Sequence, residues 1–344
     1  MMKFRKVAFG ALAASALMVV GCSNGAPAAS SNTPAPAASG ASSAGGGGGG
    51  GGSDTSGGKI TVAVITHAAP GDSFWDVVKS GAEAAGKQEG VTVTYAGDPD
   101  PAKQSQLIDN AVAQKVQGIA VSMANPDGLK DSIGKAIKAG IPVITINSGL
   151  EESKAFGAIT HVGQSEELAG EGAGAKFKEL GGGKKMLCVI HEAGNVGLEQ
   201  RCAGAKKTFG GDVQNIQVDV SNVADAQNTI KSKLLADPSI DSVLTLNPVI
   251  AKAAVQSVKD AKSKAKIATF DVSSDVIDAV LAGDILFAVD QQPYLQGYLP
   301  VVFFALKVRN GNDVGGGQPV YSGPGFVTKD NAAQVKKFAA AGTR

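Results

Sequence analysis

The chain has 344 residues, including 46 glycines and 3 cysteines, and its 32 basic residues nearly cancel its 31 acidic ones. A chain of this length forms one large or two medium domains. The balanced charge predicts no basic face and argues against nucleic acid as a partner.

The N-terminus is typical of an export signal. Three basic residues lie within the first six positions, and the apolar stretch that follows, residues 7–20, is shorter than the roughly 20 apolar residues of a membrane span. The run Val-Val-Gly-Cys that ends at Cys22 resembles a bacterial lipobox. We therefore predict a signal peptide over residues 1–21 and lipid on the Cys22 thiol. Ordinary secretion with an incidental cysteine is the alternative.

A tether follows the predicted lipidation site. Residues 22–58 are nearly all Gly, Ala, Ser, Pro and Thr, with unbroken glycine over 45–52. This composition cannot bury enough apolar surface to offset chain entropy, so we predict disorder with a root-mean-square reach of about 33 Å. Without the leader, the mature charge is close to −2, with 29 basic against 31 acidic residues. We expect a globular body held by lipid at the outer face of the cytoplasmic membrane, or in the periplasm.

From residue 59 onward, β-branched runs alternate with amphipathic ones, and the rhythm restarts after His161. The predicted strands are residues 60–66, 91–95, 118–122, 142–147, 185–190, 213–218, 242–246, 266–270 and 286–290. The predicted helices are residues 74–90, 104–116, 129–139, 165–180, 197–209, 224–235, 250–261 and 275–282. Nearly continuous apolar strands are typical of parallel sheets covered on both faces. The alternation predicts an α/β fold with two doubly wound sheets, of about ten strands in all.

Polar side chains follow many of these strands. They are His67, Asp72, Ser122, Asn147, Ser148, His191, Glu192, Asn247, Asp271, Asp290, Gln291 and Gln292. Ligands of open α/β sheets bind beyond the carboxyl ends of the strands. Carboxylates and amides suit a polyol because each can bond to neighbouring hydroxyls, and Phe74 and Trp75 offer apolar faces to its C–H side. We expect His67 and His161 to be structural.

The other two cysteines, Cys188 and Cys202, form a pair that is free to oxidise in an exported protein. We predict a disulfide, with two buried thiols as the alternative; two cysteines alone do not form a metal site. Residues 181–185 lack the spacing and the Ser or Thr of a phosphate-binding loop, and neither G-x-S-x-G nor H-E-x-x-H occurs. We expect no enzymatic activity, no cofactor and no metal.

Four segments carry a resemblance to a known family. They are Asp72-Ser73-Phe74-Trp75, Ile141 to Asn147 (IPVITIN), Ala268 to Asp271 (ATFD) and Gln291-Gln292-Pro293. The body from Lys59 to about Lys329 resembles the ribose-binding type of periplasmic sugar-binding proteins, the type I solute-binding proteins. The resemblance implies two Rossmann-like lobes joined by a three-strand hinge. It places residues 59–162 and 292–321 in one lobe, and 163–291 and 322–344 in the other.

The resemblance also implies a function and a set of binding residues. The lobes would close on a sugar or polyol, and the permease subunits of an ABC importer would recognise the closed form. The implied binding residues are Asp72, Phe74, Trp75, Ser122, Asn147, Ser148, Gln164, Glu199, Asn247, Asp271 and Gln291. We expect a monomer. The alternative function is a sensor that presents ligand to a membrane signalling protein.

Two departures from the ribose-binding pattern bear on the ligand. Asn147-Ser148 stands where ribose binders carry Asp-Arg, and Glu199 stands where they carry an arginine, with Arg201 two positions on. Both guanidinium groups that hold adjacent hydroxyls are thus missing from their usual places. We therefore expect a linear polyol, a cyclitol or a sugar with an apolar substituent rather than ribose.

Overall fold

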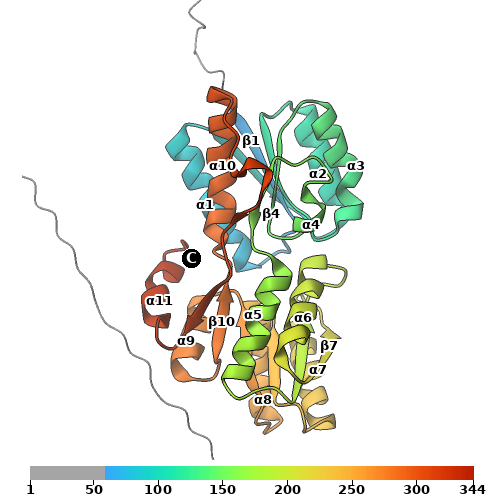
Figure 1. Ribbon diagram of the computed structural model, residues 1–344, viewed down its shortest axis with the longest axis vertical. Coiled ribbons are helices and arrows are strands. Elements are labelled where there is room, and N and C mark those ends of the chain that lie inside the picture. Colours follow the sequence, from blue (N-terminus) through green and yellow to red (C-terminus); the bar gives the residue numbers. More distant parts are fainter. Residues whose placement is uncertain (1–58) are drawn as a thin grey trace, which may run out of the picture. The chain divides into compact units, whose positions relative to one another are not determined.

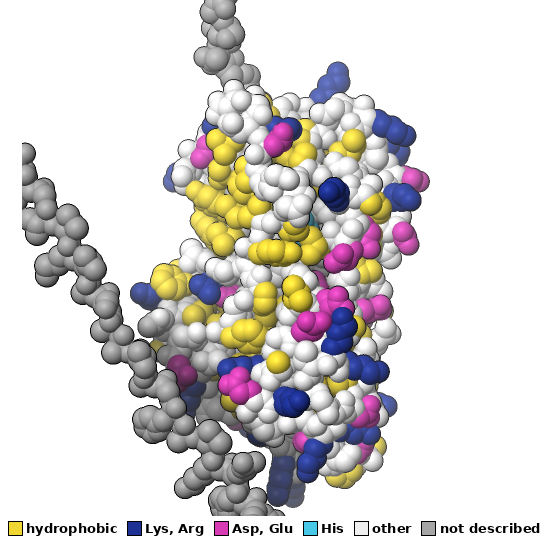
Figure 2. All heavy atoms as spheres, viewed as in Figure 1, with side chains coloured by type: hydrophobic (Ala, Val, Ile, Leu, Met, Phe, Trp, Pro, Cys, Tyr) yellow, Lys and Arg dark blue, Asp and Glu magenta, His cyan; other side chains and the backbone are white. Residues whose placement is uncertain are grey.

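The computed structural model describes residues 59–344 (Figure 1). The predicted signal peptide, Cys22 and the predicted tether lie outside the described residues. Within residues 59–344, no helix has both the length and the apolar character needed to cross a membrane. Basic and acidic side chains are interspersed over the face in Figure 2.

The first sheet has six parallel strands in the order β11-β5-β4-β3-β1-β2. They are β1 (Thr61–Thr66), β2 (Thr92–Gly97), β3 (Gly118–Ser122), β4 (Val143–Ile146), β5 (Thr160–Gly163) and β11 (Val320–Tyr321). Its helices are α1 (Ser73–Glu89), α2 (Pro101–Ala113), α3 (Pro126–Lys138), α4 (Leu150–Ser153) and α10 (Pro293–Asn310). Helices α1 and α10 pack on one face, and α2 and α3 pack on the other. We call this unit, with the short 3-10 helix η1 (Gly315–Gly317), the N-lobe.

The second sheet has the order β12-β10-β9-β8-β6-β7, with β12 antiparallel to β10 and the other neighbours parallel. Its strands are β6 (Lys185–Ile190), β7 (Asp212–Gln217), β8 (Ser242–Thr245), β9 (Lys266–Phe270), β10 (Phe287–Asp290) and β12 (Gly325–Thr328). Its helices are α5 (Glu166–Glu179), α6 (Val196–Phe209), α7 (Val223–Ala236), α8 (Pro248–Asp260), α9 (Ser274–Ala282) and α11 (Ala332–Ala340). Helices α5 and α6 cover one face and the other four cover the opposite face. This unit is the C-lobe.

The two sheets confirm the doubly wound α/β lobes predicted from the sequence. The chain passes between the lobes three times: from β5 to α5, from β10 to α10, and from β11 to β12. In each sheet the central strands are fully buried, as their apolar runs require. The carboxyl ends of both sheets are therefore held by rigid, covered strands.

The sequence interpretation missed several elements, namely β5, α4, α10, η1, β11, β12 and α11. Helix α10 has Pro300 inside it and Gly297 near its start, and both residues weaken a helical pattern. The tertiary structure explains Gly297, because a Cβ there would overlap the carbonyl oxygen of Val78 on α1. A local pattern could not show that two distant helices need glycine to approach each other.

Candidate ligand-binding site

Polar side chains from both lobes, all but Asp72 and Glu192 buried, gather where the carboxyl ends of the two sheets meet. The N-lobe contributes His67, Asp72, Ser122, Asn147 and Ser148, the C-lobe contributes His191, Glu192, Asn195, Arg201, Asn247 and Asp271, and the crossings contribute Gln164 and Gln291. Several of them also start helices: Asp72, Asn195 and Asn247 cap α1, α6 and α8 with their side-chain oxygens. Because these three residues start helices just after strands end, the capping bonds hold their side chains at the carboxyl ends of the sheets.

His67 and Ser122 act as a pair at the ends of β1 and β3. The Ser122 hydroxyl lies 2.7 Å from His67 Nδ1 and accepts a bond of 3.0 Å from the His67 backbone N–H. Ser122 is fully buried, so its contacts orient the imidazole. His67 was expected to be structural, yet the structure brings it into the cluster.

Phe74 and Trp75 lie in the first turn of α1, both mostly buried. The Trp75 ring meets His67 edge-on at 4.7 Å between centroids and Phe74 edge-on at 5.0 Å. Trp75 thus borders the polar cluster through His67 and also belongs to the hydrophobic core of the N-lobe. It presents an aromatic ring beside the polar groups.

A chain of amide and carboxylate contacts runs from the N-lobe through a crossing to the C-lobe. Asn147 Nδ2 donates to Gln291 Oε1 at 3.0 Å, and Gln291 Nε2 donates to Asp271 Oδ1 at 2.7 Å. Gln296 on α10 adds a bond of 2.9 Å to Gln291 Oε1. Asn147 and Asp271 both have left-handed backbones, with φ of 61° and 67°. Corresponding turns after β4 and β9 therefore hold the two outer members of this chain.

Arg201 is a cluster residue that the sequence interpretation left out of the site. Its guanidinium binds both carboxylate oxygens of Glu166 and lies 4.5 Å from the centre of the Phe270 ring. Gln164, at the first crossing, donates to Glu166 at 2.9 Å, while its own Oε1 is buried without a partner among residues 59–344. Glu199, in contrast, is exposed on α6 and does not join the cluster. Two positions along an α-helix are roughly half a turn apart, so only one of these two side chains faces the cluster.

Direct contacts between side chains join the two lobes. Asn247 Nδ2 donates to Asp72 Oδ2 at 3.4 Å, and Ser148 Oγ donates to Asn195 Oδ1 at 3.3 Å. His67 Nε2 lies 3.9 Å from Glu192 Oε2 and 3.5 Å from Asn195 Nδ2. The lobes therefore meet through polar groups that both of them contribute.

Burial dominates the electrostatics of the cluster. It raises the pKa of Asp271 to about 7 and that of Asp72 to about 6, because a charged carboxylate is poorly solvated there. Burial also lowers the pKa of His67 and, with the nearby Arg201 charge, lowers that of His191 to about 3. The two imidazoles are therefore neutral at pH 7.

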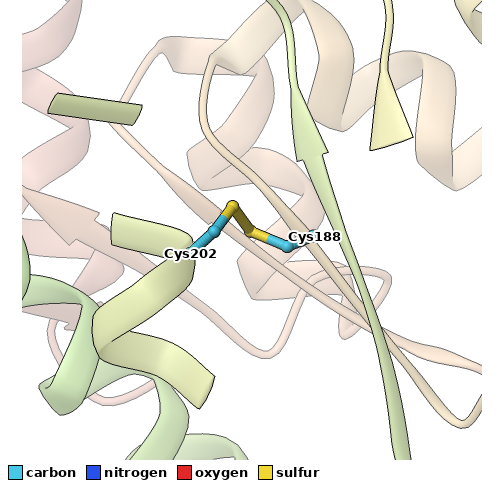
Figure 3. Close-up of a disulfide and its surroundings, with 2 residues drawn as sticks. All are labelled: Cys188 and Cys202. Carbon is cyan, nitrogen blue, oxygen red and sulfur yellow. A yellow bond between two sulfur atoms is a disulfide. The ribbon is translucent and has the colours of Figure 1, made fainter. Parts of the chain in front are cut away.

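A disulfide joins Cys188 on β6 to Cys202 on α6 (Figure 3). Both side chains are buried, and Cys202 follows Arg201 directly. Closing a loop of this size stabilises a fold by roughly 3 kcal/mol in the chain-entropy model. The bond ties α6, which starts at its cap Asn195 and carries Arg201, to β6, the second strand from the edge of the sheet. Among residues 59–344, no group of three or more His, Cys, Asp or Glu side chains is arranged so that it could hold a metal ion.

Comparisons with known proteins agree with this architecture. The family model described as a periplasmic binding protein domain matches residues 62–311. The chain belongs to this family. A ribose import binding protein of Haemophilus influenzae is 28% identical over 76% of this chain and 89% of its own length. A xylitol-binding protein of Mycolicibacterium smegmatis is 26% identical over 81% of this chain and 80% of its own.

Among solved structures, a carbohydrate transporter of Acidothermus cellulolyticus in complex with myo-inositol is 45% identical to this chain. The match covers 83% of this chain and 100% of the transporter chain, with a TM-score of 0.81. A solute-binding protein of Burkholderia graminis in complex with D-arabinose is 26% identical, with a TM-score of 0.71 over 79% of this chain and 96% of its own. Membership of this binding-protein family makes the cluster between the lobes the candidate site for a small solute.

Proposed function

We propose that this protein is the solute-binding component of an ABC importer, and that its ligand is a cyclitol rather than a pentose. The observation that carries the proposal is the 45% identity to a carbohydrate transporter with myo-inositol bound. The departures from the ribose-binding pattern support it, since Ser148 and Glu199 replace the two arginines. The relatives named for ribose share a lower identity, at 28% and below.

The side chains of the cluster suit a ring in which every carbon carries a hydroxyl. Asp72 and Asp271 supply acceptors, and Asn147, Asn247 and Gln291 supply both donors and acceptors. Hydroxyls directed outward around a ring leave its two C–H faces apolar, and one of them can pack on Trp75. We include Asp72, Phe74, Trp75, Asn147, Ser148, Asn247, Asp271 and Gln291 among the ligand contacts. Ser122 and Gln164 are positioning residues in this proposal.

Capture proceeds by closure of the lobes. A ligand that contacts Asp72 on the N-lobe and Asp271 on the C-lobe favours the form in which both are near it. The contacts from Asn247 to Asp72 and from Ser148 to Asn195 add to the closed form without any ligand atom. The membrane subunits of the importer would then recognise the closed outline.

The location of the protein is part of the proposal. The apolar leader and the sequence at Cys22 support export and lipid attachment, and the glycine-rich tether supports a body that reaches about 33 Å from its anchor. A protein held in this way would meet its permease by diffusion in two dimensions. We expect it to act as a monomer.

Calorimetry of the purified protein with myo-inositol, ribose, xylitol and glucose tests the ligand class. We expect saturable binding of myo-inositol and affinity at least tenfold weaker for ribose. Trp75 is the only tryptophan, so intrinsic fluorescence should follow the same titration. Trp75→Phe provides the control for the optical signal, which it should abolish. Tight binding of ribose with no response to myo-inositol would contradict the proposal.

A further inference from the structure

The charges of the candidate site do not balance. Asp72, Glu192 and Asp271 bring three carboxyl groups to it from both lobes. Within residues 59–344, no lysine or arginine forms an ion pair with these three carboxylates. Arg201, the basic residue of the cluster, binds both carboxylate oxygens of Glu166 instead. The Arg201 guanidinium therefore pairs with a fourth carboxylate, and its charge reaches Asp271 only without direct contact, opposing the rise in the pKa of that group.

The two histidines do not supply the missing positive charge. His67 lies 3.9 Å from Glu192, but burial holds its pKa below the ordinary value. His191 carries a buried Nδ1 without a partner in the described chain, and the Arg201 charge adds to burial in lowering its pKa. Both rings are neutral at pH 7 and can accept a hydrogen bond from a cation.

Closure brings these like charges toward one another. Asp72 comes from the N-lobe, whereas Glu192 and Asp271 come from the C-lobe, and the neighbouring Glu192 adds to burial in raising the pKa of Asp72. The Asp72 charge likewise contributes to the raised pKa of Asp271. A neutral polyol leaves this repulsion in place. A ligand with one positive charge removes it, because opposite charges a few ångströms apart attract strongly in a partly dry site.

The surroundings of Asp72 and Glu192 suit an ammonium group in particular. His67, in the same β1–α1 connection as Asp72, lies 3.9 Å from Glu192, and the Trp75 ring meets His67 at 4.7 Å. An aromatic ring is a surface that cations prefer. Acidic side chains also gather on both sides of the boundary between the lobes near α4 and α6 (Figure 2), and α4 carries Glu151 and Glu152 in its first turn. Such a group of acidic side chains attracts a cationic solute toward the boundary between the lobes.

We infer that the preferred ligand is an amino-substituted cyclitol, with its protonated amine between Asp72 and Glu192 and its hydroxyls toward Asp271, Asn147 and Gln291. This inference rests on the proposed function and specifies the ligand of the same site. It adds that the site prefers a positively charged cyclitol to a neutral one.

The test compares myo-inositol with an inosamine, the cyclitol in which one hydroxyl is replaced by an amine, by calorimetry at pH 7 on the full purified protein. We expect the inosamine to bind at least tenfold more tightly than myo-inositol. Its advantage should shrink as ionic strength rises, because added salt screens the attraction.

Two variants assign the preference to the proposed carboxylates. Asp72→Asn keeps an oxygen that can cap α1, and Glu192→Gln keeps the shape of its side chain, so each removes one charge with little change of form. Each should lower the ratio of the two affinities by about tenfold. The control is Glu83→Gln, a carboxylate of α1 that is mostly exposed and pairs with Lys79, and it should leave the ratio unchanged.

The outcomes distinguish a wrong charge preference from a wrong function. If myo-inositol binds as tightly as the inosamine, or if both charge-removing variants keep the wild-type ratio, the charge preference is wrong and the proposed function stands. If neither cyclitol binds to the folded protein, the proposed function fails and the inference fails with it.

Discussion

Asp271 is a buried carboxylate that costs stability in the ligand-free protein and is proposed to bind the ligand in the complex. It is 7% exposed, it accepts a hydrogen bond from Gln291, and the nearby Arg201 is already bound to Glu166. Burial raises its pKa to about 7. Since the unfolded value is near 4, the folded protein binds more protons than the unfolded chain between about pH 4 and 7, and stability falls as pH rises through this interval. The carboxylate is thus retained at a cost to the fold.

We predict that Asp271→Asn stabilises the ligand-free protein at pH 8 by up to about 4 kcal/mol and has little effect at pH 4. The same change should weaken cyclitol binding roughly ten- to a hundredfold, because a charged acceptor is lost. Denaturant unfolding at the two pH values and calorimetry measure the two effects. Asp131→Asn, at an exposed position on α3, is the control. An unchanged unfolding free energy at pH 8 would contradict the burial argument.

The side chains that follow strands were visible in the sequence, but their roles were not. Strand ends pointed to Asn147, Asn247 and Asp271, and all three lie in the cluster. Glu199 and Arg201 are two positions apart on α6, and the pattern of that helix alone does not show which one faces inward. The structure buries Arg201 against Glu166 and Phe270 and leaves Glu199 in solvent.

At the scale of elements, two helix pairs pack closely through glycine. In the N-lobe, Gly297 of α10 and Gly81 of α1 lie against the partner helix, since a Cβ at either would overlap backbone atoms of Val78 or Tyr294. In the C-lobe, Gly170 on α5 and Gly204 on α6 have the same role. These contacts set how near α1, which begins beside Asp72, lies to α10, which begins beside Gln291.

We predict that Gly297→Ala destabilises the protein by about 1–3 kcal/mol, because the added methyl group forces two helix backbones apart. Gly134→Ala on α3 is the matched control, since nothing lies within 4 Å of its Cβ position. That substitution should stabilise by up to about 1 kcal/mol through helix propensity. Thermal unfolding of both variants gives opposite signs if the packing is as described; two shifts of the same sign would refute it.

At the scale of the whole molecule, the balance between open and closed forms depends on the side-chain contacts between the two lobes. Asn195 takes part in two of them: its Oδ1 accepts from Ser148, and its Nδ2 lies 3.5 Å from His67 Nε2. Within the C-lobe it also donates to Glu192 at 2.8 Å. It also caps α6. A shorter side chain that still caps α6 therefore tests the contacts that Asn195 makes with the N-lobe.

Asn195→Ser should retain α6, because serine is also a good N-cap, while the ligand-free protein opens more often. We expect a larger radius of gyration in solution scattering without ligand and about five- to tenfold weaker ligand binding, the loss that one or two neutral hydrogen bonds account for. Asn222→Ser, the same exchange at the exposed cap of α7, is the control. Equal scattering curves for both variants would show that these contacts do not govern closure.

The sequence by itself determined the alternation of strands and helices, the division into two doubly wound sheets and the polar residues at the strand ends. These follow from local periodicity and composition, which act over a few residues. Only the tertiary structure decided that Ser122 orients His67, that Arg201 is paired with Glu166, and that α10 lies against α1. Each of these depends on residues 35 to more than 200 positions apart, and a polar side chain becomes a binding, capping or positioning group only when distant neighbours determine its burial and its partners.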